Sequence, residues 1–87
     1  MTKKDLYSGL REQLELLEWP RIYPFKFIVP IDKVDEIYKL FRKQDTTTKV
    51  SKKGNYISVT AKPFMYNSDK VIEVYEKAAE IDGIMAL

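Results

Sequence analysis

Apolar and polar residues alternate along parts of the chain with the period of a β-strand. The clearest case is 56–62, where Ile57, Val59 and Ala61 alternate with Tyr, Ser and Thr. This pattern predicts a strand with one buried side and one side that faces solvent. The predicted strands are 23–29, 46–50, 56–62 and 84–87. Their apolar sides form the predicted core, which consists of Phe25, Phe27, Val29, Val50, Ile57, Val59 and Ala61.

Three other segments show the 3.6-residue period of amphipathic helices. Each begins at a side chain that can accept hydrogen bonds from the backbone N–H groups of the first helical turn. The predicted helices are 3–17, 32–44 and 68–81, and their predicted caps are Thr2 with Asp5, Asp32 and Ser68. The segment 63–67 is a predicted loop, and Asp82-Gly83 is expected to end the last helix.

The predicted N-terminal helix carries a stripe of leucines at spacings of four, four and three residues: Leu6, Leu10, Leu14 and Leu17. An isolated helix of this length is only marginally stable in water. We therefore expect Leu10, Leu14 and Leu17 to dock on the rest of the domain. The alternative is that the stripe packs against a partner.

A tight turn connects 46–50 to 56–62. Ser51 at its first position and Gly54 at its fourth favour a type I turn closed by a residue in the left-handed conformation. We interpret both residues as structural.

The order of the elements is β-α-β-β-α-β after an extra N-terminal helix, which predicts an α+β protein with a ferredoxin-like fold. Right-handed crossovers place both following helices on one face of a four-stranded antiparallel sheet of order 4-1-3-2. We divide the chain into an N-terminal helical arm, 1–18, and a ferredoxin-like domain, 19–87.

The amino-acid composition excludes several kinds of catalytic and metal-binding site. The 87 residues contain no Cys and no His, which excludes disulfides, thiolate clusters, His-bound zinc and Ser-His or Cys-His nucleophiles. The carboxylates fall mainly on predicted polar helix faces, so we predict neither an enzyme nor a cofactor or metal. No stretch has transmembrane or signal-peptide length, and we expect a cytoplasmic protein. A formal net charge of +2 is too small to indicate a nucleic-acid or membrane partner.

Several motifs are informative together: Leu16-Leu17-Glu18-Trp19-Pro20, Lys26, Ser51 with Lys53-Gly54-Asn55-Tyr56, Ser58-Val59, and Tyr75-Glu76 with Ile81-Asp82. Over 14–87 the chain resembles the YbeD-like bacterial proteins, which have an ACT-like ferredoxin fold. The resemblance implies this fold, a cytosolic setting and a regulatory role. It supplies no activity, ligand or catalytic residue.

Comparison with two other kinds of ferredoxin-like domain argues against RNA and against an amino acid as the ligand. RNA-recognition domains stack bases on several aromatic residues of one sheet face, but Asn55, Ile57 and Thr60 occupy aromatic positions of that motif here. ACT domains typically bind amino acids at a Gly-containing loop after the first strand. The loop 29–32 has no Gly, and its proline lacks an N–H donor.

We predict a small binding module, most simply a regulatory or adaptor domain that contacts a protein as a monomer or homodimer. Lys53, Asn55 and Tyr56 are its candidate contact residues, because they would supply charge, hydrogen bonds and an amphipathic anchor. The rivals are an ACT-like sensor of a small ligand and a binder of anions or nucleic acid. The second rival would use lysines on the open sheet face, whose plainer role is to protect a sheet edge from aggregation.

Overall fold

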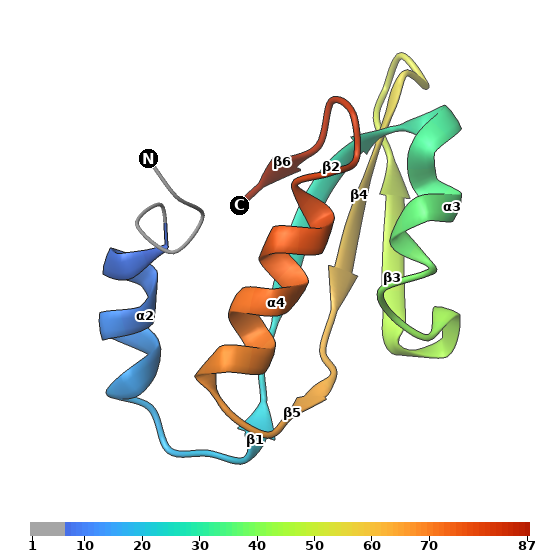
Figure 1. The fold of residues 1–87 in the computed structure, drawn as a ribbon. Helices are drawn as coiled ribbons and strands as arrows, with labels where there is room; N and C mark the ends of the chain where they lie inside the picture. The colour runs from blue at the N-terminus through green and yellow to red at the C-terminus, as the bar shows by residue number, and fades with distance from the viewer. Residues whose placement is uncertain (1–6) are drawn as a thin grey trace.

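The structure is a computed structural model that describes residues 7–87. Figure 1 shows the α-helices packed beside antiparallel strands, and two 3-10 turns (η) complete the described elements. The elements are α2 (Ser8–Glu15), β1 (Arg21–Ile22), β2 (Phe25–Pro30), η1 (Ile31–Lys33), α3 (Val34–Ile37), η2 (Lys43–Asp45), β3 (Thr46–Val50), β4 (Tyr56–Ala61), β5 (Phe64–Met65), α4 (Ser68–Ala78) and β6 (Met85–Ala86).

The main sheet has four strands in the order β3-β4-β2-β6, and every neighbouring pair is antiparallel. Its register places Val29 opposite Ile57 and Val50 opposite the same residue from the other side. A separate two-stranded sheet joins β1 to β5. The architecture is therefore α+β and compatible with a ferredoxin-like fold.

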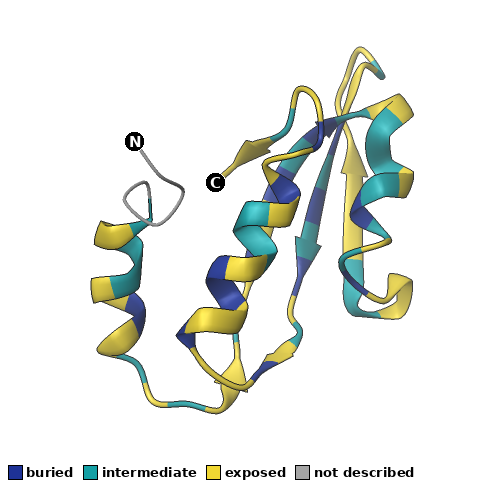
Figure 2. Cartoon of the chain, viewed as in Figure 1, coloured by how far each residue is buried: buried dark blue, intermediate teal, exposed yellow. Residues whose placement is uncertain are grey.

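The two central strands bury one side and expose the other, as their alternation predicts. On β4, Ile57, Val59 and Ala61 are buried, whereas Tyr56 is exposed and Ser58 and Thr60 are intermediate. The predicted register of this strand is thus confirmed, and Figure 2 shows buried positions on β2, which passes behind α4, and on β4, which lies between α4 and α3 in this view.

Aromatic rings join the sheet to the helical layer. The ring of Phe25 lies 5.3 Å from that of Phe41, which follows α3, and 5.2 Å from that of Tyr75 on α4. The ring of Phe27 contacts the same two partners. Both helical segments therefore cover the same side of the sheet.

The N-terminal helix docks on its own chain. Leu14 is 1% exposed and belongs to the main core, while Leu10 and Leu17 are partly buried against it. Polar contacts to the start of α4 reinforce the packing: Arg11 pairs with Asp69, and the Ser68 hydroxyl donates to the Glu15 carboxylate at 2.8 Å.

Docking of the three leucines is confirmed, although the helix ends at Glu15 and not at 17. Leu6 and the predicted Thr2–Asp5 capping box lie outside the described residues. The division of the chain at residue 18 stays a prediction.

The predicted helix over 32–44 is wrong in length. Only Val34–Ile37 is α-helical, and no side chain caps α3 or η1, so Asp32 is not the predicted N-cap. After Ile37 the backbone forms i→i+3 hydrogen bonds, such as Leu40 N–H to Ile37 C=O. Aspartate, β-branched and aromatic residues are weak helix formers, so tertiary contacts that bury Ile37 and Phe41 determine the local geometry.

Val50 was predicted in the core but is 50% exposed. Thr48, on the same side of β3, is also exposed, although the residues opposite both of them on β4 are buried. The reason is that β3 is an edge strand and the short α3 does not cover its helix-facing side.

The predicted loop 63–67 instead contains β5, which pairs with β1 through Arg21 opposite Met65. The N-cap of α4 is Asn67 and not Ser68, because the Asn67 side chain accepts the Lys70 N–H at 2.9 Å. Ser68 is buried in the first turn, where its hydroxyl meets α2. Two-residue strands carry too little periodic signal to be recognised in the sequence.

Candidate functional site

The sheet face opposite the helices carries a mixed apolar and cationic surface. The pairing brings Lys49, Ser58, Ile28 and Met85 into one row across the four strands. Tyr56 lies in the adjacent row and is 45% exposed. We call this surface the open face, and its side chains are Lys26, Ile28, Thr47, Lys49, Tyr56, Ser58, Thr60 and Met85.

One end of the open face is hollowed next to the β3–β4 turn. The hollow has a volume of about 240 Å³ and is lined by Ile28, Lys49, Val50, Ser51, Lys52, Tyr56 and Ser58. Ile28 and Tyr56 belong to the open face and two lysines border them, whereas Val50 belongs by its register to the helix-facing side of β3. Such a site can accept an apolar side chain whose neighbours are negatively charged.

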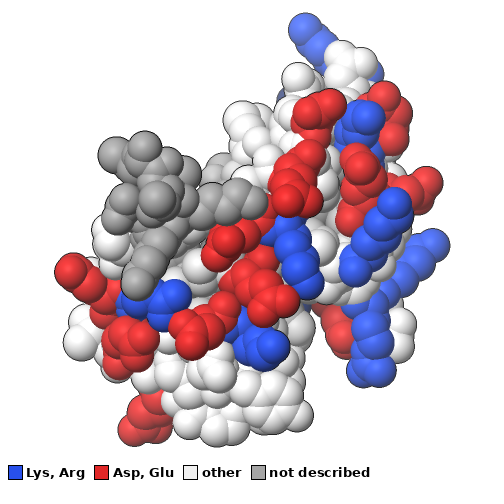
Figure 3. Space-filling view, viewed as in Figure 1, with Lys and Arg blue, Asp and Glu red and all other residues white. Residues whose placement is uncertain are grey.

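Charge is distributed unequally between the two faces. Within residues 7–87, no strand contains Asp or Glu, so Lys26 and Lys49 are the charged residues of the open face. Figure 3 shows the helical side, where acidic side chains gather among basic ones. On α4, for example, Glu73 pairs with Lys77 and Lys70, and these lysines lower the pKa of its carboxyl. The lysines of the open face have no comparable acidic neighbours on the strands.

The turn beside the hollow is held by its own hydrogen bonds. The Gly54 N–H donates to the Ser51 C=O at 3.0 Å, and the Tyr56 N–H donates to the Ser51 hydroxyl at 3.2 Å. Gly54 has φ +75°, the left-handed conformation expected at this position. Ser51 and Gly54 therefore occupy the structural positions that the sequence indicated.

The candidate contact residues Lys53, Asn55 and Tyr56 are all exposed, but the structure distinguishes between them. Tyr56 lines the hollow, whereas Lys53 and Asn55 lie at the turn beyond it. The Asn55 backbone carbonyl accepts the Ile31 N–H at 3.0 Å and so ties the turn to the end of β2.

The sequence did not single out Ile28, which lines the hollow, as a site residue. The predicted alternation of the first strand did contain a signal for Ile28, since it placed this residue opposite the buried face.

The loop after β2 offers little to an amino-acid ligand. Pro30 has no N–H, and the N–H of Ile31 is already bonded to Asn55. Two backbone donors that could face a ligand carboxylate are thus absent or occupied.

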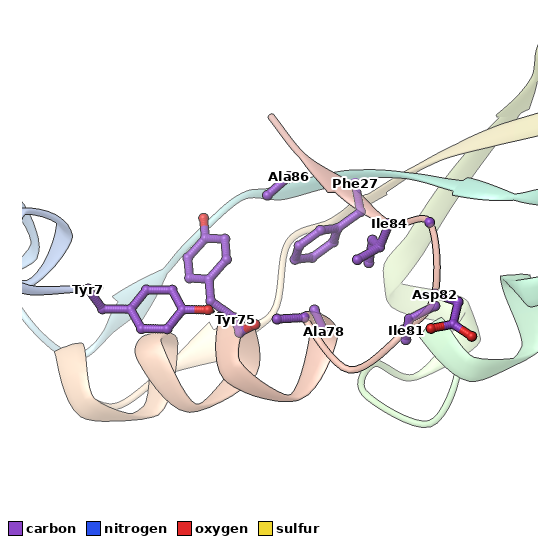
Figure 4. Close-up of a pocket in the computed structure, with 10 residues that line it drawn as sticks. Tyr7, Phe27, Tyr75, Ala78, Ile81, Asp82, Ile84 and Ala86 are labelled. Atoms are coloured by element: carbon purple, nitrogen blue, oxygen red, sulfur yellow. Dashed lines mark hydrogen bonds between the residues drawn. The ribbon is translucent and has the colours of Figure 1, made fainter. Parts of the chain in front are cut away.

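A second cavity, of about 400 Å³, lies between α4, the segment after it and β6. Figure 4 shows Tyr7, Tyr75 and Phe27 along this cavity, with Asp82 near its far end. The Tyr7 hydroxyl donates to the Tyr75 backbone carbonyl at 3.3 Å. Burial raises the pKa of the Tyr75 phenol, and a hydrogen bond with Tyr23 acts in the same direction, so the phenol is neutral at physiological pH.

Residues 7–87 contain no cluster of three potential Asp, Glu, His or Cys ligands. None of the helices between these residues combines the length and apolar character needed to cross a membrane.

Comparison with known proteins places this architecture in a family. The model of a family described as "Protein of unknown function (DUF493)" matches residues 14–87. The chain belongs to this family. Over 77 residues it is 32% identical to a UPF0250 protein of Shewanella halifaxensis and 30% identical to one of Shewanella oneidensis. Each match covers 80% of this chain and 88% of the relative. No solved structure matches the chain significantly.

The resemblance to YbeD-like bacterial proteins is thereby confirmed. The family match contains the whole open face and the β3–β4 turn, but it begins at Leu14, near the end of α2.

Proposed function

We propose that this protein is a non-catalytic cytoplasmic binding module with an ACT-like ferredoxin fold. It acts as a regulatory or adaptor domain and contacts a protein partner through the open face and the adjacent turn. Tyr56 is the central contact, and Lys49, Lys52, Lys53 and Asn55 surround it.

The observation that carries this proposal is the apolar hollow beside Tyr56, bordered by lysines on a face without strand carboxylates. Protein interfaces commonly combine an apolar centre that contains aromatic side chains with a polar or charged rim. Tyrosine suits such a centre because its ring buries a large area while its hydroxyl forms a hydrogen bond.

A protein partner fits this surface better than a nucleic acid. Stacking of single-stranded bases contributes about 1–3 kcal/mol per base and normally uses several aromatic platforms. Among the described residues of the open face, Tyr56 is the one aromatic side chain, since the others are lysine, isoleucine, methionine, serine and threonine.

The second cavity supports a second candidate function, the sensing of a small ligand. Its volume of about 400 Å³ lies in the range of small-molecule sites. Its aromatic walls and the carboxylate of Asp82 suit a small cation with an apolar part. Calorimetric titration with a panel of amines and amino acids would test this function, and loss of binding in Asp82→Asn would support the site.

The open-face proposal predicts that two substitutions weaken partner binding without unfolding the protein. The partner would first be identified by affinity capture and then purified for calorimetric titration. Tyr56→Ser and Lys53→Glu should each weaken its binding by at least about tenfold, which corresponds to ~1.4 kcal/mol. Both side chains are exposed, so the melting temperatures should change little.

Tyr66→Ser is the matched control. Tyr66 is exposed like Tyr56 but lies between β5 and α4, away from the open face. It should leave partner affinity unchanged. Unchanged affinity in both Tyr56→Ser and Lys53→Glu would refute the proposed function, as would equal losses in Tyr56→Ser and Tyr66→Ser.

A further inference from the structure

We propose that the outer edge of β3 binds an extended segment of the protein partner as an additional strand of the sheet. The segment has alternating acidic and apolar residues. This inference rests on the proposed function and assigns the partner's chemistry and its mode of contact.

The first argument is the direction of the backbone groups of β3. In an antiparallel pair, residues that exchange hydrogen bonds alternate with residues that do not. The Ser51 N–H donates to the Tyr56 C=O at 2.9 Å, and the Lys62 N–H donates to the Asp45 C=O at 3.4 Å. Odd-numbered residues from 45 to 51 therefore direct their backbone groups toward β4.

The even-numbered residues direct theirs away from the sheet. The Thr46 N–H is bonded to the Lys43 C=O, which leaves the N–H and C=O groups of Thr48 and Val50 at the outer edge. These four groups match the hydrogen-bonding pattern of one more strand.

The second argument is that this edge is accessible. From Thr47 to Val50 every residue of β3 is exposed, and β4 is its sole strand neighbour in the described sheet. Proline, bulges and covering elements commonly block such edges in other proteins. Here β3 contains no proline and its residues from Thr47 to Val50 are exposed, while Lys49 disfavours pairing with a strand that lacks a complementary carboxylate.

The third argument concerns the side chains beside which an added strand would lie. On the open face its residues would lie next to Thr47 and Lys49, close to Lys52 and the hollow. Residues directly opposite each other on paired strands have Cβ atoms about 4.5–5.5 Å apart, so a carboxylate there would pair with Lys49.

On the other side of β3, the added strand would meet Thr48 and the exposed half of Val50. An apolar, β-branched residue covers such a surface best. Because side chains alternate between the faces of a strand, the matching segment alternates between acidic and apolar residues.

A second copy of this chain fits less well. Pairing two copies of β3 about Thr48 would put each Lys49 opposite Thr47 of the other copy, so no carboxylate would meet either lysine. The segment Thr46–Val50 contains no acidic residue that would compensate.

The test uses labelled synthetic peptides in which valine alternates with glutamate or, as a matched control, with lysine. Fluorescence anisotropy should show binding of the glutamate peptide and at least tenfold weaker binding of the lysine peptide. Amide hydrogen exchange measured by NMR should slow at Thr48 and Val50 when the glutamate peptide is added.

Two variants separate the backbone contribution from the charge. Thr48→Pro removes an outward N–H and should weaken glutamate-peptide binding at least tenfold, whereas Thr48→Val should retain it. Lys49→Glu should reverse the preference between the two peptides. Because Lys49 is exposed, the Lys49→Glu variant should fold, and its binding still tests the inference if Thr48→Pro does not fold.

Several results would overturn the inference. These are no binding of the glutamate peptide at millimolar concentration, equal binding of both peptides, unchanged binding by folded Thr48→Pro, or slowed exchange at Thr48 caused by self-association or an oligonucleotide. If Tyr56→Ser abolishes binding of the natural partner while Thr48→Pro and Lys49→Glu do not, the proposed function stands and the strand-addition inference fails.

Discussion

Replacing Leu14 with alanine should lower the free energy of unfolding by about 2–5 kcal/mol, the usual effect of truncating a buried leucine. Leu14 is 1% exposed and shares the core with residues of the sheet and α4. Its backbone carbonyl also accepts the Trp19 indole N–H at 2.9 Å, which fixes the chain as it leaves α2. In a domain of this size, each kcal/mol corresponds to a melting-temperature shift of about 4–8 °C.

Leu16→Ala is the matched control for this prediction. Leu16 is 79% exposed, and it immediately follows α2. Its truncation should change stability by no more than about 0.5 kcal/mol. Denaturant titration and calorimetry of both variants would measure the difference. Similar stabilities of the two variants would show that α2 does not contribute to the core in solution.

Replacing Gly83 with alanine should lower the free energy of unfolding by about 2–5 kcal/mol, because two destabilising effects, backbone strain and a steric clash, combine at this position. Gly83 has φ +79°, where a side chain costs about 1–2 kcal/mol. A Cβ atom there would also lie 2.8 Å from Cγ of Pro30 at the end of β2. Overpacking of this kind typically adds about 1–3 kcal/mol.

Gly54→Ala separates the two penalties. Gly54 has nearly the same backbone angle, φ +75°, but a Cβ atom there would have no neighbour within 4 Å. The Gly54→Ala variant should therefore lose about 1–2 kcal/mol of its free energy of unfolding, which is the contribution of backbone strain alone. Denaturant titration of both variants gives the contribution of the Gly83–Pro30 contact as a difference. Equal losses of stability in the two variants would contradict a destabilising contact between a side chain at position 83 and Pro30.

The central part of the fold could be predicted because its local signals agree with its burial. In β4, strict alternation separated Ile57, Val59 and Ala61 from Tyr56 on the opposite face. The two turn positions Ser51 and Gly54 required particular side-chain and backbone chemistry that the sequence supplies directly. The same information identified Tyr56 as a residue that neither the turn nor the core requires.

Other parts could not be predicted because distant contacts overrule weak local preferences. The stretch after Ile37 has a helical pattern of apolar residues, yet the contact of Phe41 with Phe25 accompanies tighter i→i+3 turns. Val50 looked like a core residue because its apolar character does not reveal whether a helix covers it. Pairing between β1 and β5 depends on segments about forty residues apart, each too short for a periodic signal.

The sequence by itself determined the alternating strands, the amphipathic helices and the tight turn, because these follow from side-chain period and backbone preference within a few residues. The sequence also excluded disulfides, His-bound zinc and Ser-His or Cys-His nucleophiles, since the chain contains no Cys and no His. Only the tertiary structure decided where α3 ends, which side of β3 remains uncovered and which residues meet at the hollow. Packing of Phe41 on Phe25 accompanies the end of α3, and strand pairing brings Ile28, Lys49 and Tyr56 together from three separate strands.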